Sequence, residues 1–292
     1  MVTHINFRDQ IAKNKRNSIL LLIIVFLILI FVGYIISQII RTDFFIFATL
    51  WIVGSITYLI ISYYNSDKIA LISVNAKEAE PQRYRQLYNL VEGLCLASGL
   101  PMPKIYIMES DMINAFATGR DEKHSAICVT TGALKKLNKQ ELEGVLAHEL
   151  SHIRNYDIRF VTLVAVLVGI ISILSQFFIR SLWWGGRDKD KGNTILFVSG
   201  ILLAIIAPIV VKLVQLAISR KREFMADAGS VEITRYPQGL VSALKKIKND
   251  RPENISPAIA PLFFSDPLKQ RIINLFNTHP PLEKRIEVLE AM

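Results

Sequence analysis

The histidine pair His148 and His152 has the spacing of a metal site. Glu149 follows the first histidine, so that residues 148–152 are His-Glu-Leu-Ser-His. On an α-helix, residues four apart lie on one face, so both imidazoles can reach one metal ion while the carboxylate handles a proton beside it. The competing interpretation is a helix with two solvated histidines. The chain has only five histidines, which makes this spacing rare by chance and favours the metal site.

A catalytic zinc site of this kind needs a third protein ligand, because such sites use three ligands and a water molecule. The extended metzincin motif fails here, since Asn155 and Ile158 occupy its next glycine and histidine positions. Residues 158–186 contain no Asp or Glu. A carboxylate ligand some twenty residues downstream of the motif, as in thermolysin-like enzymes, is therefore excluded as well.

Long apolar stretches lie on both sides of the histidine motif. Apolar residues make up 51% of the chain, which is high for a soluble globular protein. Residues 18–40 and 44–64 carry no charge and are long enough to cross a bilayer as helices. Residues 158–179 and 194–218 form two further apolar stretches. We predict four transmembrane helices; the first run is too long for a signal peptide and lacks a small-residue cleavage site.

Charge next to these stretches orients the chain. Four basic residues between 8 and 16 place the N-terminal arm, residues 1–17, in the cytoplasm by the positive-inside rule. Each pair of spans forms a hairpin, so residues 65–157 and 219–292 share the cytoplasmic side as two parts of one catalytic domain. The loop 180–193 is more basic than this topology favours, and a shallow second hairpin is the alternative.

Glu223 and Asp227 are the first carboxylates that return to the catalytic side. Because they are four residues apart, one can bind zinc while the other orients a ligand histidine. We assign the metal to Glu223. Asp227 either orients a ligand histidine or balances the charge of the basic residues 220–222. Asp157 is open in a similar way, because it either orients a ligand histidine or only caps the next helix.

The remaining segments predict a small domain of helices and strands. Asn138 and Glu141 form a capping box at the start of the histidine helix. Apolar spacing and flanking Gly, Pro, Asp or Ser predict a helix at 80–99 and a small antiparallel sheet from strands at 104–108, 114–118 and 126–130.

Charge and cysteine content exclude other classes of protein. The net charge is +9, but the basic residues concentrate beside the apolar stretches, where topology and anionic lipid explain them. Since they form no stripe interleaved with aromatic residues, no nucleic-acid partner is expected. Cys95 and Cys128 lack CxxC spacing, so we predict core residues rather than a disulfide or thiolate site.

Three segments together resemble the HtpX proteases of bacterial membranes, which are relatives of the CAAX prenyl proteases. They are HELSH at 148–152, SRKREFMADAG at 219–229 and THPPLEKRI at 278–286. The resemblance implies a mainly α membrane protein with four transmembrane helices and a cytoplasmic α+β, gluzincin-like catalytic domain with a small β-sheet. It also implies quality control at the bacterial inner membrane, with misfolded or damaged membrane proteins cut at the cytoplasmic face.

The resemblance also implies roles for individual residues. His148, His152 and Glu223 correspond to ligands of one zinc ion per chain, Glu149 to the general base, and Asp227 to a residue behind a ligand histidine. The first four assignments agree with the reasoning from spacing and elimination.

Four further roles depend on the resemblance alone. Asn114 and Ala115 correspond to a segment that holds the substrate as an added strand. His279 and Arg285 correspond to residues that stabilise the transition state.

The resulting hypothesis is a zinc endopeptidase in which the metal and Glu149 activate a water molecule. Its partners would be the lipid bilayer and polypeptide substrates held with little sequence preference. One alternative is a dedicated prenyl-protein protease, and another is a catalytically silent membrane scaffold or metal sensor. The sequence predicts no oligomeric state.

Overall fold

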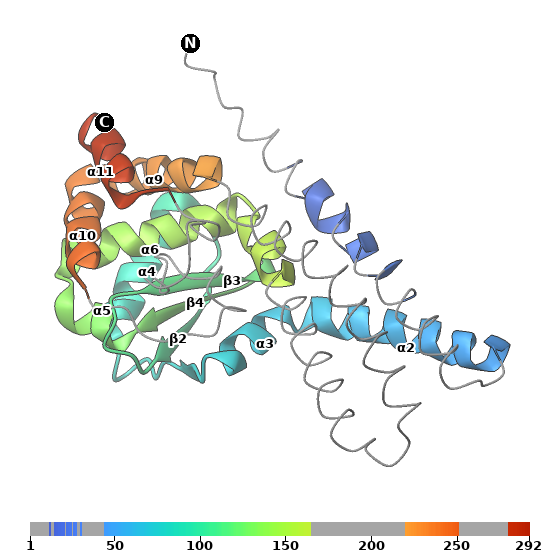
Figure 1. Ribbon diagram of the computed structural model, residues 1–292. Coiled ribbons are helices and arrows are strands. Elements are labelled where there is room, and N and C mark those ends of the chain that lie inside the picture. Colours follow the sequence, from blue (N-terminus) through green and yellow to red (C-terminus); the bar gives the residue numbers. More distant parts are fainter. Residues whose placement is uncertain are drawn as a thin grey trace, which may run out of the picture.

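The computed structural model describes residues 44–164, 220–250 and 280–292, with scattered positions between residues 12 and 30. The helices and strands of the described residues are α2 (Phe44–Tyr64), α3 (Ser66–Ser73), β1 (Lys77–Glu78), α4 (Arg85–Ser98), β2 (Lys104–Met108), β3 (Ala115–Asp121), β4 (His124–Thr130), α5 (Thr131–Lys136), α6 (Lys139–Arg154), α9 (Arg220–Thr234), α10 (Pro237–Asn249) and α11 (Leu282–Glu290). Figure 1 shows a small sheet packed among helices, with α2 extending to one side.

The four strands form one mixed sheet in the order β1-β2-β4-β3. The chain passes from β2 to the edge strand β3 and then turns back, so that β4 lies between them. β4 therefore runs antiparallel to β3 and parallel to β2, with Lys104 opposite Ala126. The three predicted strands are confirmed within a few residues, but the predicted antiparallel sheet is wrong. The crossover through β3 makes the central pairing parallel.

The two faces of the sheet bury different clusters, as alternation along a strand requires. Ile105 and Ile127 point to the face that packs with α4 and α6. Phe116 and Cys128 point to the opposite face, which packs against α3. Cys95 and Cys128 are both buried and free, which confirms the prediction of core residues.

The ends of α6 are fixed by local interactions. The Asn138 side chain accepts a hydrogen bond from the backbone N–H of Glu141 (3.0 Å), and the Glu141 carboxylate accepts one from the backbone N–H of Asn138 (2.7 Å). The predicted capping box is therefore confirmed. After α6, Tyr156 adopts a φ of 58°, and this left-handed turn starts a second helical segment at residues 157–164.

The predicted membrane spans are only partly covered by the described residues. α2 occupies the predicted span 44–64, and the few described residues of the predicted span 18–40, all between 18 and 30, are helical. Within the described residues, no helix combines the length and the apolarity of a membrane span. The predicted spans 158–179 and 194–218 lie mostly or entirely outside the described residues, so the four spans stay predictions.

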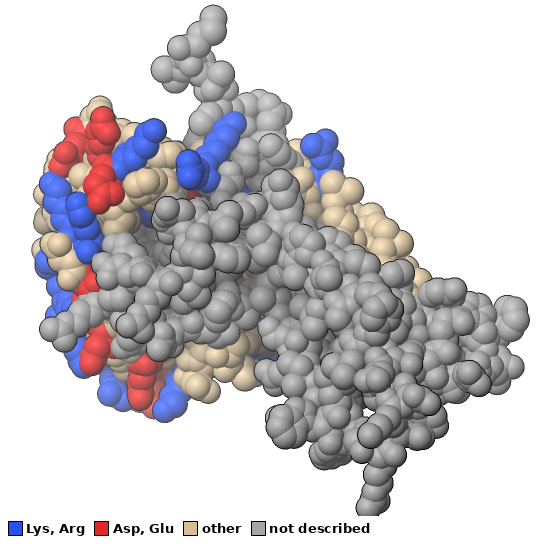
Figure 2. Space-filling model, viewed as in Figure 1, with Lys and Arg blue, Asp and Glu red and all other residues tan. Residues whose placement is uncertain are grey.

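The described surface of the catalytic part carries charges of both signs. Figure 2 shows Lys and Arg side chains intermixed with Asp and Glu on this face. Part of this mixture consists of exposed ion pairs, such as Lys245 with Glu290 at 2.7 Å. Such pairs contribute little to stability because water screens them.

Candidate active site

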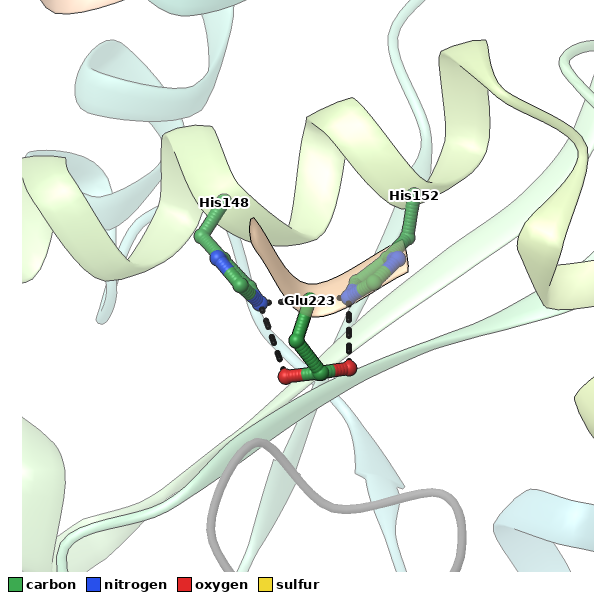
Figure 3. Close-up of side chains that lie close together, drawn as sticks. All are labelled: His148, His152 and Glu223. Atoms are coloured by element: carbon green, nitrogen blue, oxygen red, sulfur yellow. Dashed lines mark hydrogen bonds and ion pairs between the residues drawn. The ribbon is translucent and has the colours of Figure 1, made fainter. Parts of the chain in front are cut away.

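α6 presents His148 and His152 on one face, as the spacing predicts. The two rings point toward each other in Figure 3, and their Nε2 atoms lie 3.1 Å apart. His148 is fully buried and His152 is partly exposed. The deep packing of α6 fixes the first ring, while the second remains accessible from one side.

Glu223 reaches the same point from α9. Its Oε1 lies 3.5 Å from Nε2 of His152, and its Oε2 lies 3.8 Å from Nε2 of His148 (Figure 3). α9 approaches α6 closely because small residues line the crossing: Ser230 donates a hydrogen bond to the carbonyl of Gly144 at 2.8 Å. A carboxylate distant in the sequence is thereby placed beside both imidazoles.

Gly229 is expected to be essential for this close crossing. A Cβ atom at this position would lie 2.1 Å from Oγ and 2.9 Å from Cβ of Ser151. Gly229→Ala should therefore push α9 away from α6, cost about 1–3 kcal/mol as overpacking, and lower both the melting temperature and the zinc affinity. The control is Gly93→Ala in α4, where an added Cβ meets nothing within 4 Å. Equal melting temperatures and zinc affinities for the two variants would contradict the expectation.

Each histidine has a carboxylate behind it. Nδ1 of His148 lies 3.0 Å from Oδ1 of Asp227, and Nδ1 of His152 lies 3.0 Å from Oδ2 of Asp157. A carboxylate only accepts hydrogen bonds, so each Nδ1 donates its proton, and a neutral ring then has its lone pair on Nε2. In the neutral form of each ring, this lone pair points at the space beside Glu223.

This donor set fits a zinc ion. The three ligand atoms from His148, His152 and Glu223 lie within 4.8 Å of one another. Tetrahedral zinc bonds of about 2.0–2.1 Å place ligand atoms about 3.3 Å apart, close to the observed 3.1, 3.5 and 3.8 Å. Two imidazoles and one carboxylate also match catalytic sites that keep a position open for water.

The two imidazoles have different electrostatic surroundings. Burial lowers the pKa of His148 to about 4, and the nearby Arg285 also favours the neutral ring. For His152, burial lowers the pKa, but the hydrogen bond to Asp157 and the charges of Glu223, Asp157 and Glu149 raise it to about 9. His148 is therefore neutral and ready to act as a ligand, whereas His152 is surrounded by negative charge that suits a cation.

Glu149 lies beside these ligands and is almost fully buried. Burial, together with the charge of Glu223, raises the pKa of its carboxyl group to about 7. The carboxylate accepts a hydrogen bond from the backbone of Ala117 in β3, while its Oε1 atom has no partner among the described residues. A carboxyl group of this kind can take up and release a proton near neutral pH.

The structure describes three of the four residues whose roles depend on the family resemblance alone. Asn114 is buried and immediately precedes β3, and Ala115 is the first residue of that strand. Arg285 is fully buried and lies against Asp227 and Glu223. His279 lies outside the described residues.

For Asp157, as for Asp227, the sequence leaves two roles open. The structure places its carboxylate on His152, with Nε of Arg222 at 3.9 Å from its other oxygen. The turn at Tyr156 brings Asp157 back toward α6. A positive φ at this position is not visible in the sequence, so the contact could not be assigned from spacing.

A helix with the HExxH motif above a small mixed sheet, joined by a glutamate from a second helix, defines a zincin-like metalloendopeptidase. The chain belongs to peptidase family M48, whose family model matches residues 81–292. It is 46% identical over 297 residues to the "Protease HtpX homolog" of Caldanaerobacter subterraneus subsp. tengcongensis, with 96% of each chain covered. It is 43% identical over 289 residues to the protein of the same name from Dictyoglomus thermophilum, covering 98% of this chain and 95% of that one.

A solved structure supports the fold. The crystal structure of S. mikatae Ste24p superimposes with a TM-score of 0.51 at 20% sequence identity, covering 97% of this chain and 67% of that one. The similarity extends over nearly the whole chain. At this identity it is a likeness of fold only.

Proposed function

We propose that this chain is a zinc-dependent membrane endopeptidase that holds one zinc ion with His148, His152 and Glu223. The observation that carries the proposal is the convergence of two Nε2 atoms and one carboxylate next to the buried Glu149. Zinc bound at this place would polarise a peptide carbonyl and make a water molecule more acidic.

Within the protein, Glu149 carries the proton. It accepts a proton from the attacking water and then delivers it to the leaving amine as the peptide bond breaks. Asp227 and Asp157 keep the two imidazoles in the tautomer and orientation that leave Nε2 available. The same carboxylate thus acts first as base and then as acid.

The edge strand β3 supports the choice of an extended polypeptide as substrate. Among the described strands it pairs only with β4, which leaves its other edge for an added strand. The hydrogen bond from Ala117 to Glu149 brings this edge next to the proposed base. We place the substrate backbone along β3, starting at Asn114 and Ala115. Main-chain hydrogen bonds depend little on the side chains of the substrate, so the cleavage specificity should be broad.

The membrane is the proposed setting of this activity. α2 exposes large apolar side chains along its length, including Leu50 (68% exposed) and Val53 (58% exposed), and a bilayer would cover them. We place the catalytic domain and the N-terminal arm, residues 1–17, on the cytoplasmic face of a bacterial inner membrane. There the enzyme would cut misfolded or damaged membrane proteins.

Removal of the metal tests the proposal. The full chain, purified in detergent and loaded with zinc, should cleave a casein-like unfolded substrate. A chelator should stop the cleavage, because the polarising cation is lost, and added zinc should restore it. Fragments are measured by gel electrophoresis and bound zinc by metal analysis.

Two outcomes would contradict the proposal. One is unchanged cleavage after metal analysis shows that the zinc has gone. The other is a zinc-loaded preparation that cleaves nothing, which would favour a catalytically silent scaffold.

A further inference from the structure

Arg285 lies at the centre of the charged cluster although it comes from the last helix of the chain. It belongs to α11, and its side chain is fully buried. It contacts residues of both α6 and α9, which carry the proposed zinc ligands. A buried guanidinium requires partners that compensate its charge.

Those partners are the two carboxylates of α9. Nε of Arg285 donates to Oδ2 of Asp227 at 2.9 Å, and Nη2 donates to Oδ1 at 2.6 Å. Nη1 lies 3.4 Å from Oε2 of Glu223. One planar group thus holds Asp227 by a two-pronged interaction and also reaches the proposed zinc ligand.

The same contacts lead to the histidine helix. Oδ1 of Asp227 lies 3.0 Å from Nδ1 of His148, whereas Nη2 of Arg285 lies 3.4 Å from that atom. Asp227 is therefore the closer partner of the ring, and Arg285 acts on the ring through it. Without the arginine, Asp227 would be a buried carboxylate free to rotate away from His148.

We propose that Arg285 is a positioning residue that fixes Asp227 and Glu223 for zinc binding, so that metal retention depends on the docking of α11. This inference rests on the proposed function. It gives Arg285 the role of positioning the metal ligands. The family resemblance implies a different role, the stabilisation of the transition state.

The docking of α11 is well defined. Leu289 is fully buried in the main core, and Leu282 is also part of it. Two exposed ion pairs also lie between α11 and α10, Glu283 with Lys248 at 2.9 Å and Glu290 with Lys245 at 2.7 Å, but the buried leucines account for most of the docking. The position of Arg285 is thus set by packing outside the metal site.

The test measures zinc affinity on the full chain in detergent, with a competing chromophoric chelator. Arg285→Gln should weaken zinc binding by about 10–100-fold, as expected when a group behind a ligand is lost. Arg285→Lys keeps the charge but not the two-pronged donation, so a smaller loss is expected. The control is Arg154→Gln, which removes an exposed ion pair between α6 and α9 (Arg154 to Glu232, 2.7 Å) and should leave the affinity unchanged.

A double variant separates positioning from general stability. If Arg285 acts through Asp227, the double variant Arg285→Gln with Asp227→Asn should have about the same zinc affinity as the single variant with the lower affinity. Additive losses would contradict the proposal. The visible spectrum of the cobalt-substituted protein should also change in Arg285→Gln, because the geometry of the ligands changes.

The outcomes distinguish this inference from the proposed function. A wild-type chain that binds no zinc overturns the proposed function itself. Native zinc affinity in a folded Arg285→Gln variant overturns the positioning role and returns Arg285 to the substrate side of the reaction. If Arg285→Gln does not fold, Arg285→Lys decides: folded protein with native affinity and an unchanged cobalt spectrum contradicts the proposal.

Discussion

Glu149→Gln is expected to lower kcat/KM for peptide hydrolysis by about a thousandfold while one zinc ion per chain stays bound. The amide keeps the size of the side chain but cannot take a proton from water or pass it to the leaving amine. It does not remove any of the three proposed ligands, His148, His152 and Glu223. The measurement is the initial rate on a fluorogenic peptide or casein, together with metal analysis of the same sample.

The matched control is Glu143→Gln, which makes the same chemical change on the same helix. Glu143 lies on α6 and is partly exposed, and its replacement should change the rate by less than about twofold, as for an ordinary surface substitution. Proteolysis retained by Glu149→Gln at full zinc occupancy would assign the base to another residue. Loss of zinc in that variant would show that Glu149 supports the site and is not only its base.

The HExxH helix could be predicted closely because its determinants are local. The capping box at Asn138 and Glu141 and the four-residue spacing of His148 and His152 depend only on helix geometry. The structure places both imidazoles and Glu149 where that geometry requires. The elimination of nearer carboxylates points to Glu223, and the structure brings its carboxylate beside both imidazoles.

The parallel pairing of β2 and β4 could not be predicted in the same way. Strand positions follow from composition and turn residues, but the order of strands depends on long-range packing that single-strand patterns do not contain. β3 is adjacent to β2 in sequence and yet lies at the far edge of the sheet. The proposed pairing of β3 with a substrate strand depends on this edge position.

The contacts of Asp157 and Arg285 depend on tertiary structure to a still greater degree. Asp157 reaches His152 only because the chain reverses through the left-handed Tyr156. Arg285 reaches Asp227 only because α11 packs on α10 and also contacts α9. A family resemblance can mark Arg285 as important, but the sequence does not reveal which residue it contacts.

Glu223→Gln is expected to weaken zinc binding by more than about 100-fold, beyond the loss expected for a group behind a ligand. The substitution keeps the shape of the side chain and replaces a charged oxygen donor by a neutral amide. The carboxylate oxygens of Glu223 lie 3.8 Å from Nε2 of His148 and 3.5 Å from Nε2 of His152. Peptide hydrolysis should fall with the zinc occupancy and recover in part at high zinc concentration.

The order of zinc affinities among carboxylate variants decides which group binds the metal. Asp157→Asn and Asp227→Asn each remove the partner of a histidine Nδ1 and should each lower the zinc affinity by about 10–100-fold. The control is Glu232→Gln, also on α9. Among the described contacts the exposed Glu232 pairs only with the partly buried Arg154, so its replacement should leave the zinc affinity unchanged. A larger loss for Asp157→Asn than for Glu223→Gln would make Asp157 the ligand. Because Asp157 faces the Nδ1 side of His152 and Glu223 faces its Nε2 side, that result would also require the ring of His152 to be turned around.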